Sequence, residues 1–254
     1  MDFSHITALV KEAGQLVFHE ELRRKVDVKG EADFVTAIDL GISAFLKEHL
    51  GKIDASVGFF SEEEQGTLTD PCWILDPIDG TTNLIYGYGL SSVSLALYQN
   101  GAVRYGVVYN PFNGECFTAE EGKGAWLGNK YLRVSMRPMR KALIEFGAGS
   151  THKENADANF SLVKEVFKQC IDIRRICSSA LDLCYIASGR IDGYFEKILK
   201  PWDIAAGALI LTEAGGMITD YDGAPLQLAE ATSVIAGNGI VNPVLQEIIQ
   251  KYRG

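Results

Sequence analysis

The feature that most constrains the fold is a hairpin signal in the first half of the chain. Two apolar segments, Ser91 to Tyr98 and Val103 to Tyr109, flank Asn100-Gly101, a pair typical of tight turns between antiparallel strands. Helical and strand-like patterns are mixed along the rest of the chain. A simple doubly wound sheet is therefore excluded, and we expect a layered, mixed α+β protein.

Most other segments of the chain show the periodicity of helices or strands. Apolar residues at helical spacing predict helices over 3–24, 36–50, 157–169, 178–187, 201–214 and 241–252. Short apolar runs predict strands over 72–75, 115–119, 124–127, 131–135, 142–146, 191–195, 217–219 and 233–236. The strand at 72–75 should end at Asp76-Pro77, because proline cannot donate a hydrogen bond to a sheet.

Composition places the chain among the soluble globular proteins, and we expect it in the cytoplasm. It has 254 residues, of which 47% are hydrophobic and 22% charged. No apolar run approaches the roughly 20 residues of a membrane helix. The start of the chain lacks the basic segment and the cleavage site of a secretory signal. The 5 cysteines include no Cys-X-X-Cys pair, so we expect reduced thiols and no zinc site.

Acidic residues are concentrated in one part of the chain. The net charge is −9, which argues against nucleic-acid binding, because that activity needs a basic surface. Between Ile53 and Val103 there is no lysine, arginine or histidine. The acids in this window are Asp54, Glu62, Glu63, Glu64, Asp70, Asp76 and Asp79. A folded segment of this kind repels itself unless it stays solvated or binds a cation.

The segment Trp73 to Asn83 (WILDPIDGTTN) carries the most specific pattern. Asp76 stands at the end of an apolar strand, and Asp79, three residues later, can turn to the same side. Gly80 and Thr81 then offer free backbone N–H groups at the start of a helix, which is a position that binds phosphate. Carboxylates beside an anion site suit Mg²⁺ or Mn²⁺ rather than zinc. The alternative is that both aspartates only cap the turn.

Further acids are candidates for the same cluster. Glu62 lies in the base-free window, although a solvated acidic loop, which we expect for Glu64, would explain it as well. Asp203 and Asp39 each lie in the first turn of a predicted helix, where the helix dipole favours a carboxylate, so a capping role also fits them. The histidines are His5, His19, His49 and His152. All lie outside these motifs, so we expect carboxylate and metal chemistry without histidine catalysis.

Two motifs of the chain resemble the signatures of the inositol monophosphatase family. The first is Asp76 to Asn83 (DPIDGTTN), and the second combines Trp202-Asp203 with Thr212 to Gly216 (TEAGG). Asp33 to Asp39 (DFVTAID) and Glu62-Glu63 match in the same order. The resemblance implies a layered αβαβα sandwich. It also implies a single domain over residues 1–254, with an N-terminal half of about 1–140 and a C-terminal half of about 141–254.

The resemblance implies an enzyme that hydrolyses inositol 1-phosphate to inositol and phosphate. Two to three Mg²⁺ ions would be bound, with Mn²⁺ as an alternative. The metal ligands would be Glu62, Asp76, the carbonyl oxygen of Ile78, Asp79 and Asp203. The residues acting in catalysis would be Thr81, Asp39 and Glu62. The residues binding substrate would be Asp79, Gly80, Thr81, Ser179, Glu196 and Asp203.

The resemblance also implies how some of these groups act and what the protein associates with. Thr81, hydrogen-bonded to Asp39, would orient the attacking water, and the backbone N–H groups of Gly80 and Thr81 would hold the phosphate. The enzyme would be a lithium-sensitive homodimer that acts on a small phosphate monoester. It would bind neither nucleic acid nor a membrane.

The sequence departs from the family pattern near the substrate. Ser61 replaces a glycine that is common before the glutamate pair. Cys177 and Ser179 stand where inositol-active members often carry glycine and alanine. One alternative is therefore a broader sugar phosphatase that acts on fructose 1,6-bisphosphate or histidinol phosphate. An alternative from another class is a regulatory binding protein that keeps the fold without catalysis.

Overall fold

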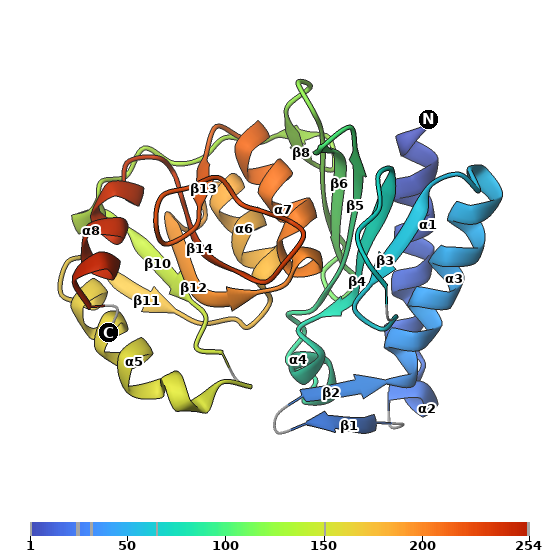
Figure 1. Cartoon of the computed structure of the whole chain (residues 1–254), viewed down its shortest axis with the longest axis horizontal. Coiled ribbons are helices and arrows are strands. Elements are labelled where there is room, and N and C mark those ends of the chain that lie inside the picture. The colour runs from blue at the N-terminus through green and yellow to red at the C-terminus, as the bar shows by residue number, and fades with distance from the viewer. Residues whose placement is uncertain (1, 24–25, 31–32, 65, 150, 253–254) are drawn as a thin grey trace.

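Helices and sheets alternate in layers in the computed structural model of the protein, in the order helix, sheet, helix, sheet, helix (Figure 1). The structure describes residues 2–23, 26–30, 33–64, 66–149 and 151–252, and for residues 23, 28–30, 33 and 34 it describes the backbone alone. The prediction of a mixed α+β, layered αβαβα fold is confirmed. Among the described residues, no helix combines the length and the apolar character needed to cross a bilayer.

The first sheet has the strand order β3-β4-β5-β6-β7-β8-β9. Its strands are β3 (Gly58–Ser61), β4 (Cys72–Asp79), β5 (Ser92–Gln99), β6 (Ala102–Asn110), β7 (Glu115–Glu120), β8 (Ala125–Leu127) and β9 (Lys130–Tyr131). β3 runs parallel to β4, and every later pair is antiparallel. The predicted hairpin joins β5 to β6, and both Asn100 (φ 53°) and Gly101 (φ 74°) adopt the left-handed conformation that such a tight turn requires.

The second sheet has the order β11-β10-β12-β14-β13. Its strands are β10 (Leu143–Phe146), β11 (Asp172–Arg174), β12 (Gly193–Leu199), β13 (Met217–Thr219) and β14 (Thr232–Gly237). β11 and β12 run parallel to β10, whereas β14 pairs antiparallel with β12 and β13. A separate antiparallel hairpin, β1 (Val26–Gly30) with β2 (Asp33–Thr36), lies beside the first sheet (Figure 1).

Helices cover the faces of both sheets. The α-helices are α1 (Phe3–Gly14), α2 (Glu20–Arg23), α3 (Ala37–Ile53), α4 (Thr81–Ile85), α5 (Ala156–Phe167), α6 (Ser179–Ala187), α7 (Pro201–Glu213) and α8 (Asn242–Tyr252). The 3₁₀ turns are η1 (Gln15–Phe18), η2 (Met139–Lys141) and η3 (Lys153–Asn155). α1 and α3 pack on the outer face of the first sheet, α6 and α7 lie between the sheets, and α5 and α8 cover the far face of the second (Figure 1).

The middle layer is packed closely by glycines. A Cβ atom on Gly106 of β6 would lie 2.9 Å from the carbonyl oxygen of Ala206 in α7. A Cβ atom on Gly207 would lie 2.8 Å from the side chain of Leu183 in α6. Both contacts leave no room for a larger residue, so α7 is held in a fixed position against the first sheet and α6. This matters for function because α7 carries Asp203 in its first turn.

Several details of the sequence prediction were wrong. The strand predicted over 131–135 is present only at Tyr131, the last residue of β9. The helix predicted over 3–24 is divided into α1, η1 and α2, and Gly14, the last residue of α1, packs so closely against Tyr109 that a Cβ atom would lie 2.9 Å from the ring. The strand predicted to end at Asp76 continues to Asp79. Pro77 is tolerated there because pairing with β5 is irregular between Asp76 and Asp79, so no ladder hydrogen bond is required of it.

Candidate active site

The irregular end of β4 places Asp76 and Asp79 together in the interior. Asp76 is 2% exposed and Asp79 is 7% exposed. The backbone N–H of Ile78 donates to Oδ1 of Asp76 at 3.0 Å, which holds that carboxylate against its own strand. Burial and then the nearby charge of Glu62 raise the pKa of Asp76 well above its usual range. Burial raises the pKa of Asp79 to about 6. The carboxylates at this strand end are therefore costly to ionise together.

Gly80 forms the turn between this strand and α4. Its φ of 91° lies in the left-handed region, and a Cβ atom there would lie 3.0 Å from the carbonyl oxygen of Cys177. Both the conformation and the space therefore require glycine. The side-chain amide of Asn83 donates to the carbonyls of Leu90 (2.7 Å) and Ile176 (2.6 Å), which fixes the turn against a distant segment.

Thr81 and Asp39 meet at the start of α4. The Thr81 hydroxyl lies 3.4 Å from Oδ1 of Asp39 and 3.1 Å from the carbonyl oxygen of Ile78. Oδ2 of Asp39 accepts from the backbone N–H of Thr36 at 2.9 Å and from its hydroxyl, so the capping interpretation of Asp39 is confirmed. Because its other oxygen faces Thr81, the same carboxylate joins the cluster. Burial raises its pKa to about 6.

Glu62 reaches the cluster through the parallel pairing of β3 with β4. Ser61 is the register partner of Leu75, so Glu62 follows β3 at the level where Asp76 follows Leu75. The backbone N–H of Glu62 donates to the Leu75 carbonyl at 3.2 Å. Its charge is among the causes that raise the pKa of Asp76. Glu64, in contrast, forms an ion pair with Lys47 at 2.6 Å, in agreement with the solvated role expected for it.

Asp203 enters the cluster from the first turn of α7. Its Oδ2 accepts from the backbone N–H of Lys200 at 2.6 Å, so the predicted cap is present. Burial and then the charge of Asp79 raise its pKa well above its usual range. Asp203 is therefore both a helix cap and a neighbour of the β4 carboxylates.

A cavity of about 240 Å³ opens beside these acids and contains Glu196. Asp79, Ser179 and Asp203 line it together with Glu196. Gly149 N–H donates to Oε1 of Glu196 at 3.3 Å, and the Tyr194 hydroxyl donates to Oε2. These bonds fix the orientation of the Glu196 carboxylate. The cavity thus brings the predicted substrate residues of α6 and β12 next to the β4 acids.

The first turn of α6 holds Asp79 in place. Oδ2 of Asp79 accepts from the Ser178 hydroxyl at 2.6 Å and from the Ala180 N–H at 2.8 Å. The Ser179 hydroxyl lies 3.5 Å from Oδ1. These donors compensate part of the burial cost of the carboxylate, which is why its pKa rises only to about 6.

Sequence reasoning missed several residues of the cavity. His152, Arg175, Lys200 and Asp182 line it, so His152, which lies outside the sequence motifs, is brought to the cavity by the fold. These residues come from loops and from α6, and nothing in the local sequence indicates that the fold brings them together. Gly147 was missed too, although a Cβ atom there would lie 1.9 Å from Cδ of Glu196. Glycine is therefore needed to make room for that carboxylate.

The donors at the end of β4 suit a hard divalent cation. Neither Oδ2 of Asp76 nor Oδ1 of Asp203 accepts a hydrogen bond from a described residue, so both are available as ligands. In the described part of the chain, no three Asp, Glu, His or Cys side chains converge as tightly as the ligands of a bound metal. The available ligands are nevertheless carboxylate oxygens, and the charges of neighbouring acids help to raise the pKa of Asp76 and Asp203. A bound cation would relieve the repulsion between these carboxylates.

Comparison with known protein families gives one match along almost the whole chain. The model of the inositol monophosphatase family matches residues 3–253. The chain is 39% identical over 241 residues to an inositol-1-monophosphatase of Rhizobium meliloti, covering 92% of this chain and 89% of that protein. It is 38% identical over 214 residues to the Nus factor SuhB of Escherichia coli, covering 83% and 80%.

Solved structures show the same fold. The extragenic suppressor protein suhB of Bartonella henselae superposes with a TM-score of 0.91 at 33% identity, covering 98% of both chains. An IMPase of Thermotoga maritima superposes with a TM-score of 0.90 at 30% identity, covering 98% of this chain and 97% of that one. The layered arrangement and the connections between layers are therefore shared with these proteins.

Proposed function

The chain belongs to the inositol monophosphatase family, and we propose that it is a Mg²⁺-dependent phosphatase that hydrolyses inositol 1-phosphate. The observation that carries this proposal is the group formed by the buried carboxylates Asp76 and Asp79 and the half-buried Asp203 beside the turn at Gly80. A cavity large enough for a small polyol adjoins them. We also propose that the chain acts as one domain, because the cluster of apolar residues between the sheets draws on both halves.

The residues that would hold Mg²⁺ are Glu62, Asp76, Ile78 through its carbonyl oxygen, Asp79 and Asp203. When bound, the cation would neutralise charge on the phosphate and lower the pKa of water, which supplies a nucleophile near neutral pH. Two to three ions would be accommodated, and Mn²⁺ would serve as well, because the donors are carboxylate and carbonyl oxygens.

Thr81, Asp39 and Glu62 would position the attacking water. The Thr81 hydroxyl has Asp39 and the Ile78 carbonyl as its acceptors, so its proton is directed away from the substrate. Its oxygen is then free to accept a hydrogen bond from a water and to orient that water toward the phosphorus atom. Glu62 would contact the same water from the end of β3. No covalent bond between protein and phosphate is required.

The substrate would lie between the turn of α4 and the cavity. The first N–H groups of a helix lack intrahelical partners, so those of Gly80 and Thr81 would donate to the phosphate oxygens. Asp79, Ser179 and Glu196 would accept hydrogen bonds from hydroxyl groups of the alcohol. Glu196 suits this role because Tyr194 and Gly149 hold it in a fixed orientation. Asp203 would contact the substrate from α7.

A broader sugar phosphatase activity is the second candidate. Arg175 and Lys200 line the same cavity, so cations stand opposite the carboxylate cluster. A second phosphate group, as in fructose 1,6-bisphosphate, would pair with them. Histidinol phosphate, with its own positive charge, would be disfavoured beside these cations.

Several properties follow from the family membership as further proposals. The enzyme would be a lithium-sensitive homodimer in the cytoplasm, acting on small phosphate monoesters without a nucleic-acid or membrane partner. A regulatory binding protein without catalysis is the alternative from a different class, and several relatives are named Nus factor SuhB.

The proposal is tested by measuring phosphate release from a panel of substrates. The panel contains inositol 1-phosphate, fructose 1,6-bisphosphate, histidinol phosphate and adenosine 3′,5′-bisphosphate, each with Mg²⁺ and with EDTA. We expect metal-dependent release with inositol 1-phosphate preferred. Preference for fructose 1,6-bisphosphate would select the second candidate. Absence of release from every substrate would favour the regulatory role.

A further inference from the structure

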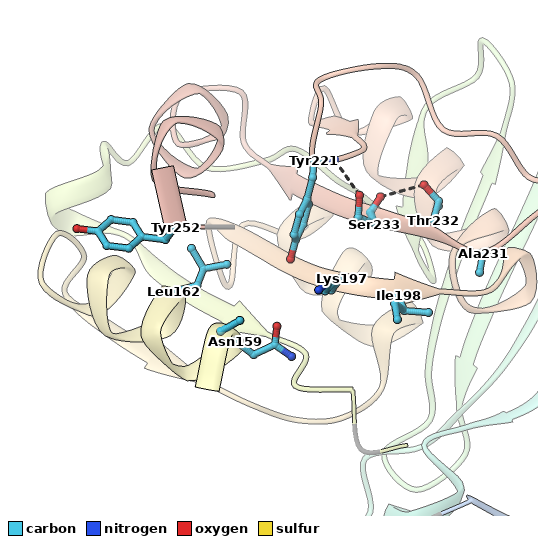
Figure 2. A pocket seen from close by; sticks show the side chains of 10 residues that line it. Asn159, Leu162, Lys197, Ile198, Tyr221, Ala231, Thr232, Ser233 and Tyr252 are labelled. Atoms are coloured by element: carbon cyan, nitrogen blue, oxygen red, sulfur yellow. Dashed lines mark hydrogen bonds between the residues drawn. The ribbon is translucent and has the colours of Figure 1, made fainter. Parts of the chain in front are cut away.

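A second cavity lies beside strand β12, and apart from Ile198 its lining residues differ from those of the candidate active site (Figure 2). Its volume is about 620 Å³, against about 240 Å³ for the active-site cavity. Its walls come from α5, β12, β14 with the segment before it, and the end of α8. Successive strand residues face opposite sides of a sheet. Lys197 accordingly lines this cavity, whereas Glu196 lines the active-site cavity.

The cavity exists because α5 and α8 cover only part of the second sheet. Their apolar side chains pack on Phe195 of β12 and Ile235 of β14, which are 3% and 1% exposed. Two residues further along β12, Lys197 is exposed, and two residues earlier in β14, Ser233 is half-buried. The uncovered part is lined mainly by apolar groups, Leu162 among them. Its volume lies in the range of ordinary small-molecule sites.

A buried phenol lines this space without a hydrogen-bond partner. Tyr221 is only 7% exposed. Its backbone N–H donates to the Ser233 hydroxyl at 3.0 Å, but its own hydroxyl makes no hydrogen bond with any described residue. Figure 2 shows the ring extending into the cavity, with the hydroxyl directed toward the region of Lys197. The ring is buried, but the hydroxyl is not among the enclosed polar atoms that lack a partner, so it is open to the cavity and can donate to an acceptor there.

The charge of the lining favours an anion. Among the described residues of the lining, Lys197 carries the formal charge and no carboxylate is present. Its Nζ donates to Oδ1 of Asn155 at 2.9 Å, and its charge also interacts with the carboxylate of Glu154, which lies outside the lining. A hydrocarbon surface with a hydroxyl donor and an ammonium group at one side matches a molecule with an apolar body and an anionic head.

We propose that this cavity binds a small amphipathic carboxylate free in solution. The hydrocarbon body lies against Leu162 and Ile198, and the carboxylate accepts a hydrogen bond from the Tyr221 hydroxyl beside Lys197. The site is separate from the phosphatase site and does not depend on the function proposed above. The two cavities share one lining residue, Ile198 of β12.

The test is calorimetric titration of the full chain with octanoate and, as a neutral analogue, octanol. Tyr221→Phe should weaken octanoate binding about fivefold, the value of one ordinary hydrogen bond. Lys197→Met keeps the hydrocarbon stem and should weaken binding of octanoate but not of octanol. Ala158→Trp fills the cavity from α5 and should abolish binding of both. Tyr131→Phe and Lys130→Met, which change an exposed tyrosine and lysine on β9, should change neither.

Several results would overturn the proposal. The first is that octanoate does not bind the wild-type chain, and the second is that it binds the Ala158→Trp variant equally well. The third is that inorganic phosphate displaces octanoate, which would place octanoate in the active-site cavity. A wild-type circular dichroism spectrum and an unchanged urea midpoint show that the Ala158→Trp variant is folded. If light scattering showed that this variant loses a dimer present in the wild type, a second copy covers the cavity instead. If it instead loses binding to anionic phospholipid vesicles, the occupant is a lipid surface.

Discussion

Replacement of Asp79 by asparagine should stabilise the metal-free protein at alkaline pH. Oδ2 of Asp79 accepts hydrogen bonds from the Ser178 hydroxyl and the Ala180 N–H, and an amide oxygen can accept both. The substitution therefore keeps these two contacts of Oδ2, loses the acceptor that Oδ1 offers to Ser179, and removes a buried charge. The charge is costly because the carboxylates of Asp76, which is buried, and Asp203, which is half-buried, lie nearby.

The size of the effect follows from the pKa of Asp79. Burial raises this pKa from 3.8 to about 6 in the folded protein. The folded state thus holds the proton more tightly than the unfolded state. The stabilisation that the folded state gains by holding a proton on Asp79 is complete below about pH 4 and is lost as the pH rises through about 6. A difference of about 2 pKa units corresponds to about 3 kcal/mol, the upper limit of the gain from Asp79→Asn at pH 8.

The assay is urea unfolding in EDTA, followed by tryptophan fluorescence at about pH 8 and about pH 4. At the higher pH the free energy of unfolding should rise by up to about 3 kcal/mol, and at the lower pH by less than about 1 kcal/mol. With saturating Mg²⁺ the wild type should instead be more stable than Asp79→Asn. Only the wild type keeps the Asp79 carboxylate as a metal ligand and gains the free energy of metal binding.

Asp192→Asn is the matched control. Asp192 is 0% exposed, but its carboxylate accepts from Nε of Arg137 at 2.9 Å and from the Leu143 N–H at 2.8 Å. Removal of this negative charge by Asp192→Asn should lower the free energy of unfolding by about 1–3 kcal/mol at pH 8. The reasoning is refuted if Asp79→Asn gives no gain at pH 8 or the same gain at both pH values.

Three further substitutions test the proposed reaction. Asp76→Asn should lower phosphate release by about 10³-fold or more while circular dichroism shows a folded protein, and wild-type turnover would contradict its role as a metal ligand. Thr81→Ala should lower kcat about 10²-fold or more and Thr81→Ser by less than about tenfold, since only a hydroxyl can orient the water. Equal losses in the two variants would exclude that role. Glu196→Gln should raise KM for inositol 1-phosphate and leave p-nitrophenyl phosphate hydrolysis unchanged, so an equal loss with both substrates would argue against contact with the alcohol.

Local features were predictable because the interactions that create them act over a few residues. The turn at Asn100-Gly101 needs two residues that tolerate positive φ, and its sequence supplies them. Asp39 caps α3 through Thr36, three residues away. Asp76 and Asp79 share one strand end because three residues separate them. Their roles as metal ligands stay predictions.

The residues that reach the site from distant segments could not be predicted from their neighbours in the sequence. Glu62 joins Asp76 only because β3 pairs parallel with β4, and a loop of the same composition could have stayed in solvent. His152 and Arg175 were missed for the same reason, since each reaches the cavity from a loop. No local pattern indicates which loops meet across a sheet.

The sequence by itself determined the turn chemistry, the helix caps, the amphipathic segments and the acidic strand end, since each depends on residues close together in the chain. The tertiary structure decided how far these groups are buried and which distant segments face them. Asp203 lies near Asp79 because α7 is packed between two sheets, and Glu196 has room beside them because Gly147 lacks a side chain. The physical reason is that burial of apolar surface selects the arrangement of layers, and that arrangement sets the charge environment of each carboxylate.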